Sequence, residues 1–220
     1  MIDIERTPAS TLLRAQPVVA VLRARHARDY APVVEALLCG EVRVIELTLS
    51  TDGVFEELPA LLSAFDGEAE IGVGTVTTPE EAGRALDIGA RFLVTPTFEP
   101  SVIDVALARQ VPVLPGGLTP TELHAGWRAG ATAVKVFPAS VVGPKYVSDL
   151  RGPFPDIEIV PSGGLDADDA VRWIEAGALA VSIGGPLLQD AFHGGDLTAL
   201  TERALRISGL VAEAIEGRAS

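Results

Sequence analysis

The order of apolar segments in this 220-residue chain predicts an α/β fold, a (β/α)8 TIM barrel with an extra N-terminal helix. Two observations support this prediction. Eight short runs rich in β-branched residues alternate with segments of helical periodicity. The runs are also nearly continuous in apolar residues, as in parallel strands that are covered on both faces. A doubly wound open sheet is the alternative arrangement of the same units.

The eight predicted strands are residues 18–22, 42–49, 70–76, 91–96, 111–116, 132–138, 157–163 and 179–185. Residues 4–15 predict the extra helix, and residues 29–40, 78–89, 119–130 and 166–177 predict helices between strands. Thr78 and Thr119 are each followed by Pro and, three residues on, by Glu, which indicates a capped helix start. No Pro/Gly/Ser-rich linker interrupts the chain, so we expect one domain over residues 1–220.

The composition excludes several classes of partner. The chain has 30 acidic and 17 basic residues, a net charge of -13, which disfavours nucleic acid as a partner. No apolar run approaches the roughly 20 residues that cross a bilayer, and the N-terminal residues do not resemble a signal peptide. We therefore expect a soluble, cytoplasmic protein without a membrane partner. Cys39 is the single cysteine, and we expect it to be a small core residue.

Lys135 lies in the apolar run "GATAVKVFPAS", residues 130–140. Of the 17 basic residues only Lys135 and Lys145 are lysines, so a lysine in a strand needs a reason that arginine cannot meet. Apolar surroundings disfavour the charged form of an amine, and a neutral amine is a nucleophile that forms a Schiff base with a carbonyl. The alternative is a lysine whose amine extends to solvent at a strand end.

Glu46 interrupts the run "VRVIELTL" in the same way. It could be an acid on an exposed face or paired with Arg43. In a barrel, however, the carboxyl ends of the strands meet at one face, where the active site lies. Glu46 could then act as general acid and base beside Lys135. An amine and a carboxylate on separate strands are typical of an aldolase.

Other polar residues and glycines fall at the same strand ends. They are Arg23, Thr48, Thr75, Thr95, Ser162 and the glycines at 116, 117, 163, 164, 184 and 185. The glycine pairs after the last two predicted strands occupy the usual phosphate position of this fold. The chain has no nucleotide-binding glycine motif. His26, His124 and His193 lie far apart without metal-ligand spacing, so we expect no metal and no cofactor.

The chain resembles the class I 2-keto-3-deoxy-6-phosphogluconate / 4-hydroxy-2-oxoglutarate aldolases over nearly its whole length. The matching segments include "PVVAVLRA", "IELTLST", "GVGTVTTPEEA", "LVTPTFEP", "KVFPAS", "GPKYVSDLRGPFP", "VPSGGL" and "SIGGPLL". The resemblance implies that Lys135 is the Schiff-base lysine and Glu46 the general acid and base. It also implies substrate-binding roles for further residues, which are Thr75, Pro96, Phe137, Ser162, Gly163 and Gly164. Members of the family are typically homotrimers that need no metal.

Two positions depart from the family pattern. Some members carry an arginine where this chain has Ser50, so we expect Arg23 to bind the substrate carboxylate bidentately. Pro186 follows Gly184 and Gly185 where some members have a serine that helps to hold phosphate. Backbone N–H groups at this loop would then remain for the phosphate.

The residues and the resemblance together predict a lyase that cleaves 2-keto-3-deoxy-6-phosphogluconate, or 4-hydroxy-2-oxoglutarate, to pyruvate and an aldehyde such as glyceraldehyde 3-phosphate. The 6-phosphogalactonate aldolase is an alternative that differs in substrate stereochemistry at C4. A metal-dependent pyruvate aldolase is another. A non-catalytic phosphosugar-binding barrel is the alternative of a different class.

Overall fold

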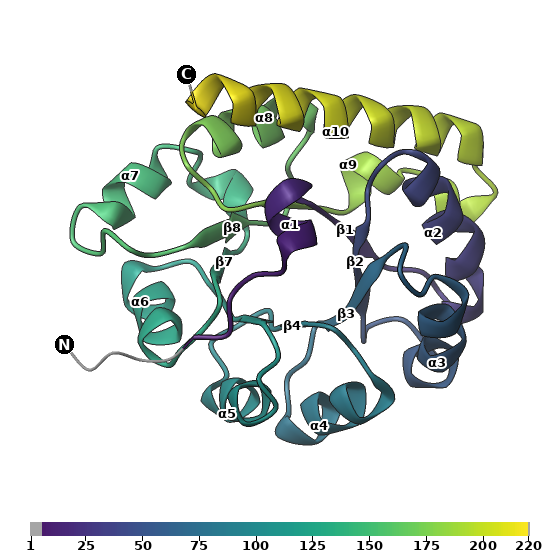
Figure 1. Ribbon diagram of the computed structural model, residues 1–220, viewed down its shortest axis with the longest axis horizontal. Coiled ribbons are helices and arrows are strands. Elements are labelled where there is room, and N and C mark those ends of the chain that lie inside the picture. Colours follow the sequence, from purple (N-terminus) through teal and green to yellow (C-terminus); the bar gives the residue numbers. More distant parts are fainter. Residues whose placement is uncertain (1–5, 220) are drawn as a thin grey trace.

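The strands of the protein form a curled parallel sheet with helices on its outside (Figure 1). The computed structural model describes residues 6–219. The strands are β1 (Val18–Leu22), β2 (Val44–Thr48), β3 (Glu70–Gly74), β4 (Leu93–Val94), β5 (Val113–Leu114), β6 (Gly116–Gly117), β7 (Val134–Val136), β8 (Ile159–Pro161) and β9 (Val181–Ile183). Each of the eight predicted runs contains a strand. The run 111–116 holds β5 and the first residue of β6, which are separated at Pro115, a residue without an N–H to continue the ladder.

Helices connect the strands. They are α1 (Thr11–Ala15), α2 (Tyr30–Cys39), α3 (Val54–Ala64), α4 (Pro79–Ile88), α5 (Pro100–Ala108), α6 (Pro120–Arg128), α7 (Tyr146–Arg151), α8 (Ala167–Glu175), α9 (Gly185–Leu188) and α10 (Leu197–Ala219). Short 3-10 helices are η1 (Ala27–Asp29), η2 (Ala139–Val141) and η3 (Ala191–His193). The predicted starts at Thr78 and Thr119 are confirmed, since each hydroxyl accepts from a backbone N–H three residues on and a Glu carboxylate accepts in return.

The strands pair in two parallel sheets. One has the order β5-β4-β3-β2-β1-β9 and the other the order β6-β7-β8. A bridge between Ser162 and Ser182 connects β8 to β9. The chain passes from β5 to β6 with only Pro115 between them. The two sheets therefore adjoin each other at both places.

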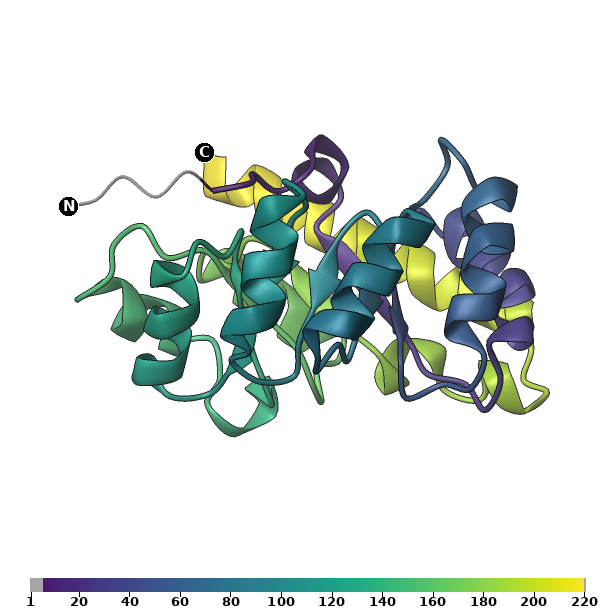
Figure 2. The same cartoon turned by 90° about the horizontal axis from the view of Figure 1, so that it is seen from below.

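The sheet buries apolar side chains on both of its faces. The outer face packs against the helices, for example Leu22, Ile45 and Leu47. The inner face forms a separate cluster of Val19, Val44, Phe92, Val94, Leu114, Ala133, Val160 and Ala180. Ala9 and Leu13, from the segment that contains α1, belong to this inner cluster. Figure 1 shows α1 over the centre of the strands, and Figure 2 shows that it lies at one end.

The segment before β1 is less helical than expected. The predicted helix covered residues 4–15, but α1 spans only Thr11–Ala15, capped by the Ser10 hydroxyl, which accepts from the Leu13 N–H at 3.0 Å. Residues 4 and 5 lie outside the described part of the chain. Pro8 explains part of the difference, because proline disfavours helical backbone in the residue before it.

The long helix α10 packs across α2. The Thr201 hydroxyl donates to the Ala36 carbonyl at 2.9 Å. Gly40 allows this approach, since a Cβ there would lie 2.3 Å from the Ala204 Cβ. The prediction for Cys39 is wrong, because this residue is exposed. In α2 the buried positions include Val33, Val34, Leu37 and Leu38, and position 39 turns away from that face. Within residues 6–219 no helix is long and apolar enough to cross a membrane.

Candidate active site

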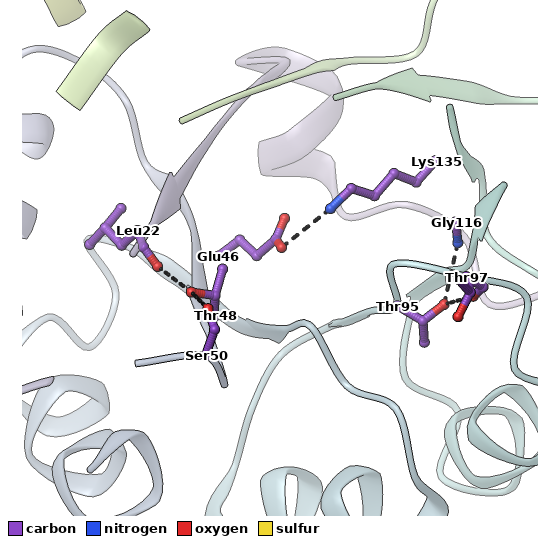
Figure 3. Close-up of polar contacts among 8 residues, drawn as sticks. All are labelled: Leu22, Glu46, Thr48, Ser50, Thr95, Thr97, Gly116 and Lys135. Carbon is purple, nitrogen blue, oxygen red and sulfur yellow. Dashed lines mark hydrogen bonds and ion pairs between the residues drawn. The ribbon is translucent and has the colours of Figure 1, made fainter. Parts of the chain in front are cut away.

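Glu46 and Lys135 meet on the inner side of the curled sheet. The Lys135 Nζ lies 3.5 Å from the Glu46 Oε1, and the two residues are only 7% and 1% exposed. Figure 3 shows the two side chains reaching toward each other from β2 and β7. Lys135 therefore does not extend its amine to solvent. Glu46 pairs with it rather than with Arg43, whose guanidinium donates to the Glu68 carbonyl at 3.4 Å.

The inner face of β3 leaves room for the Glu46 carboxylate. Gly72 and Gly74 are two inward positions of β3 that carry no side chain. A Cβ at Gly74 would lie 2.0 Å from the Glu46 Oε1, and one at Gly72 would lie 2.5 Å from the Phe92 ring. The glycines of "GVGTVT" thus fit a carboxylate and an aromatic ring. The sequence analysis did not assign this space-providing role to the two glycines. Because side chains alternate between the two faces of a strand, the spacing of the glycines could have indicated that both lie on the inner face.

Phe137 stands beside the lysine on the solvent side. Its ring centroid lies 5.6 Å from the Lys135 Nζ, and the residue is 40% exposed. A Cβ at Gly163, where φ is +92°, would lie 3.0 Å from the Phe137 ring. The ring and the "SGG" loop after β8 therefore form neighbouring walls above the buried pair.

Arg23 is exposed directly after β1, and its backbone is held on both sides. The Leu22 carbonyl accepts from the Thr48 hydroxyl at 2.9 Å and from the Tyr30 hydroxyl at 3.2 Å (Figure 3 shows the first bond). The Ala24 N–H donates to the Thr51 hydroxyl at 3.0 Å. Burial raises the pKa of Tyr30 to about 12, so its hydroxyl stays a neutral donor. Tyr30 and Thr51 were not among the residues singled out from the sequence.

The threonines at the strand ends differ in what their hydroxyls can do. The Thr95 hydroxyl donates to the Thr97 carbonyl and accepts from the Gly116 N–H at 3.3 Å (Figure 3). It therefore holds the loop after β4 rather than facing a substrate. Thr75 is half-buried after β3, with a left-handed φ of +60° that is uncommon for a threonine. Pro96 is half-buried after β4.

The loops after the last two strands begin near one another. Ser162 is 4% exposed and forms the bridge to Ser182. Gly163 and Gly164 both have positive φ, and Gly164 is exposed. Gly184 caps the short helix α9, which starts at the exposed Gly185 and has Pro186 in its first turn. Gly116 and Gly117 form the buried strand β6 instead.

A small cavity lies on the inner side of the sheet against Glu46 and Lys135. Its volume is about 20 Å³, and apolar residues such as Val19, Val44 and Phe92 form most of its wall. Ser182 also lines it and is 3% exposed. The Ser182 Oγ has no hydrogen-bond partner among the described residues. Sequence reasoning did not select Ser182.

The histidines do not converge. His26 lies 3.3 Å from the Asp52 carboxylate, and His124 stacks on Phe154 at a centroid distance of 3.9 Å. Within the described part of the chain, no three His, Cys, Asp or Glu side chains are grouped as metal ligands would be.

Comparison with known proteins identifies the family. The family model "KDPG and KHG aldolase" matches residues 9–202. A probable 2-dehydro-3-deoxy-6-phosphogalactonate aldolase from Rhizobium meliloti is 32% identical over 195 residues, which are 88% of this chain and 91% of that protein. A KHG/KDPG aldolase from Escherichia coli is 31% identical over 215 residues, which are 96% and 97% of the two chains.

Solved structures agree with this result. A native KDPGal structure superposes with a TM-score of 0.84 at 29% identity, covering 91% of this chain and 96% of that one. The KDPG aldolase from Legionella pneumophila, captured with pyruvate as a covalent carbinolamine, gives a TM-score of 0.80 at 27% identity, covering 89% and 96%. The chain therefore belongs to the KDPG and KHG aldolase family, and it is a carbon–carbon lyase.

Proposed function

We propose that the protein is a class I aldolase that forms a Schiff base through Lys135 and cleaves a phosphorylated 2-keto-3-deoxy sugar acid to pyruvate and an aldehyde. The buried ion pair of Lys135 and Glu46 carries this proposal. A nucleophilic amine and a proton-transferring carboxylate are the two groups that such a reaction needs. Both lie below walls formed by Phe137 and the "SGG" loop.

The geometry suggests the order of steps. Glu46 first takes a proton from the Lys135 ammonium, and the resulting neutral amine attacks the C2 ketone. A proton moves from the nitrogen to the carbonyl oxygen to give a carbinolamine, and Glu46 gives its proton to the departing hydroxyl. Loss of water then leaves a protonated imine. Glu46 takes the proton of the C4 hydroxyl, the C3–C4 bond breaks, and its electron pair moves to the imine as an enamine. Glu46 returns a proton to C3, and hydrolysis of the imine releases pyruvate.

The same proposal takes the fold to be a complete (β/α)8 barrel over one domain, residues 1–220. Strand register supports closure. Each residue has a paired residue on the neighbouring strand. When these pairs are traced from Glu46 through β3, β4, β5 and β6, the residue reached in the segment of β7 is Ala131, which precedes the strand. When the pairs are traced from Glu46 in the other direction, through β1, β9 and β8, the residue reached is Ala139, which follows β7. The circuit thus shifts by eight residues, the value typical of TIM barrels.

That register also accounts for the catalytic pair. Lys135 lies midway between the two levels, four strands from Glu46 in either direction. A plane perpendicular to the barrel axis therefore passes through both residues, and their inward side chains approach each other across the axis. Neither residue has to leave its strand for the pair to form.

The substrate contacts follow from what surrounds the pair. Arg23 binds the carboxylate of the keto acid bidentately, since it is exposed after β1 on a fixed backbone. Thr75, Pro96 and Phe137 line the pyruvate end. The phosphate is held at the far end by backbone N–H groups, and the residues there are Ser162, Gly163, Gly164, Gly184 and Gly185. Pro186 offers neither a hydroxyl nor an N–H.

The preferred substrate is 2-keto-3-deoxy-6-phosphogluconate, with 4-hydroxy-2-oxoglutarate as a second one. The galactonate epimer is a second candidate. The KHG/KDPG aldolase and the probable phosphogalactonate aldolase are almost equally similar to this chain, at 31% and 32% identity. The enzyme is proposed to act in the cytoplasm as a homotrimer, without metal or cofactor. The partly exposed Phe137 and Val141 offer apolar surface to a neighbouring copy.

Trapping with borohydride tests the mechanism. Incubation with pyruvate and borohydride should leave a stable adduct on the peptide that contains Lys135, because reduction of the imine makes the C–N bond permanent. The Lys135→Arg variant should keep its far-UV circular dichroism and lose both the adduct and the activity. The matched control is Lys145→Arg at the exposed second lysine, which should be trapped like the wild type. A wild-type protein that stays unmodified would exclude the mechanism.

Pyruvate release from both C4 epimers, with and without phosphate, should decide the substrate. Activity that survives EDTA excludes the metal-dependent aldolase. A protein that binds these acids but is not trapped by borohydride would be a non-catalytic binding barrel instead.

A further inference from the structure

Ser182 belongs to the same level of the barrel interior as the catalytic pair. In a barrel of this type, alternate strands contribute four side chains to each interior layer. The register that places Lys135 opposite Glu46 brings Val94 of β4 and Ser182 of β9 into the same layer. All four residues line one cavity. Three of the four members of this layer are therefore polar, although the layers toward α1 are almost entirely apolar.

The Ser182 hydroxyl is the unsatisfied member of this layer. Ser182 is 3% exposed, and its Oγ has no partner among the described residues, whereas Glu46 and Lys135 bond to each other. A buried hydroxyl without a partner is unfavourable, so an additional partner at this place stabilises the folded protein.

The other hydroxyls of the cavity are already engaged. At the end near α1, the Ser10 hydroxyl donates to the Glu70 carboxylate. The Thr132 hydroxyl donates to the Thr7 carbonyl at 2.7 Å and accepts from the Val113 N–H at 3.2 Å. Among the described residues that line the cavity, the hydroxyl without a partner therefore lies at the catalytic level and not at the α1 end.

The size of the cavity limits what can bind there. A volume of about 20 Å³ exceeds the roughly 10–15 Å³ that one water molecule needs, and it is too small for a keto acid. A buried water also needs two to four polar partners. The Ser182 hydroxyl, the unused N–H groups of Lys135 and the second oxygen of Glu46 supply them, since the ion pair uses one Nζ hydrogen and Oε1.

We propose that this cavity binds one water molecule between the Ser182 Oγ and the Lys135–Glu46 pair, and that Ser182 is thereby a positioning residue for the lysine. The catalytic part of this inference rests on the proposed function. After imine formation the lysine nitrogen keeps a single hydrogen, and Glu46 must turn to the C4 hydroxyl. The water then accepts the hydrogen bond that Glu46 gives up and keeps the iminium oriented.

A high-resolution crystal structure of the whole protein tests the water site directly. Density for a water about 2.7–3.2 Å from the Ser182 Oγ, with a second contact to Lys135 or Glu46, is expected. In Ser182→Val, whose side chain occupies the cavity, the water should be gone. An empty cavity in the wild type, at a resolution where other interior waters are visible, would overturn the site.

Kinetics test the positioning role. Ser182→Ala should lower kcat about tenfold or more, because the water that loses its Ser182 partner no longer holds its hydrogen bond to the charged lysine nitrogen, and should leave KM nearly unchanged. The rate of borohydride trapping with pyruvate should fall in parallel. A lower melting temperature with an unchanged trapping rate would mean a merely structural role and overturn the inference. Failure of the wild type to be trapped would instead overturn the proposed function. The crystal structure tests the water site independently of that result.

Discussion

Gly74→Ala should disable the Lys135–Glu46 pair without replacing either of its members. The Ala Cβ would lie 2.0 Å from the Glu46 Oε1, whereas favourable contact begins at about 3.5 Å. The carboxylate must therefore move by about 1.5 Å. The Lys135 Nζ lies 3.5 Å from the same oxygen, so a displacement of this size changes the geometry of the pair. Gly74 does not have a positive φ, so an alanine backbone fits and the clash alone determines the effect.

The expected effect follows from that displacement. Misplacement of a catalytic group by about 1 Å costs roughly 10²-fold in rate, so kcat should fall by about that factor. Overpacking of a buried site should lower the free energy of unfolding by about 1–3 kcal/mol. Steady-state pyruvate release and urea unfolding measure the two quantities on the same preparation.

Gly83→Ala is the matched control. Gly83 lies within α4, and a Cβ there would have no heavy atom within 4 Å. This substitution should raise the free energy of unfolding by up to about 1 kcal/mol, because alanine is the better helix former, and leave kcat unchanged. If Gly74→Ala retains the kcat of the wild type, Glu46 does not depend on the space at β3 and the reasoning is refuted.

Three further outcomes are expected. Burial raises the pKa of Glu70, although the hydrogen bond from Ser10 acts in the opposite direction. The folded state therefore binds the Glu70 proton more tightly than the unfolded state does, so ionisation of Glu70 lowers the free energy of unfolding as the pH rises. Glu70→Gln should therefore stabilise the protein more at neutral than at acidic pH, as measured by urea unfolding; an equal effect at both would contradict this. Arg23→Lys should raise KM for the keto acid about tenfold or more, because an ammonium cannot bind a carboxylate bidentately, and an unchanged KM would remove Arg23 from the site. Pro186→Ser should lower KM for phosphorylated substrates but not for unphosphorylated ones, since it restores a hydroxyl donor beside Gly185; equal changes for both would show that position 186 does not face the phosphate.

Local sequence signals predicted the secondary structure well where they act within a few residues. The Thr-Pro-x-Glu segments at Thr78 and Thr119 predicted two helix starts, because each capping box closes within three residues. The apolar runs predicted the strands, since buried parallel strands need such residues on both faces. Cys39 shows the limit: its apolar neighbours suggested burial, but its angular position on α2 decides its exposure.

By itself, the sequence determined the eight segments that contain strands, four of the helices between them, and the two chemically unusual residues, Lys135 and Glu46. Only the tertiary structure decided that these two meet at 3.5 Å, that Gly74 provides the space for the carboxylate, and that Ser182 lines the same cavity with a hydroxyl that has no partner among the described residues. The physical reason is that each contact joins strands far apart in the chain. Their relative height depends on the register accumulated over every intervening strand, which no local pattern records.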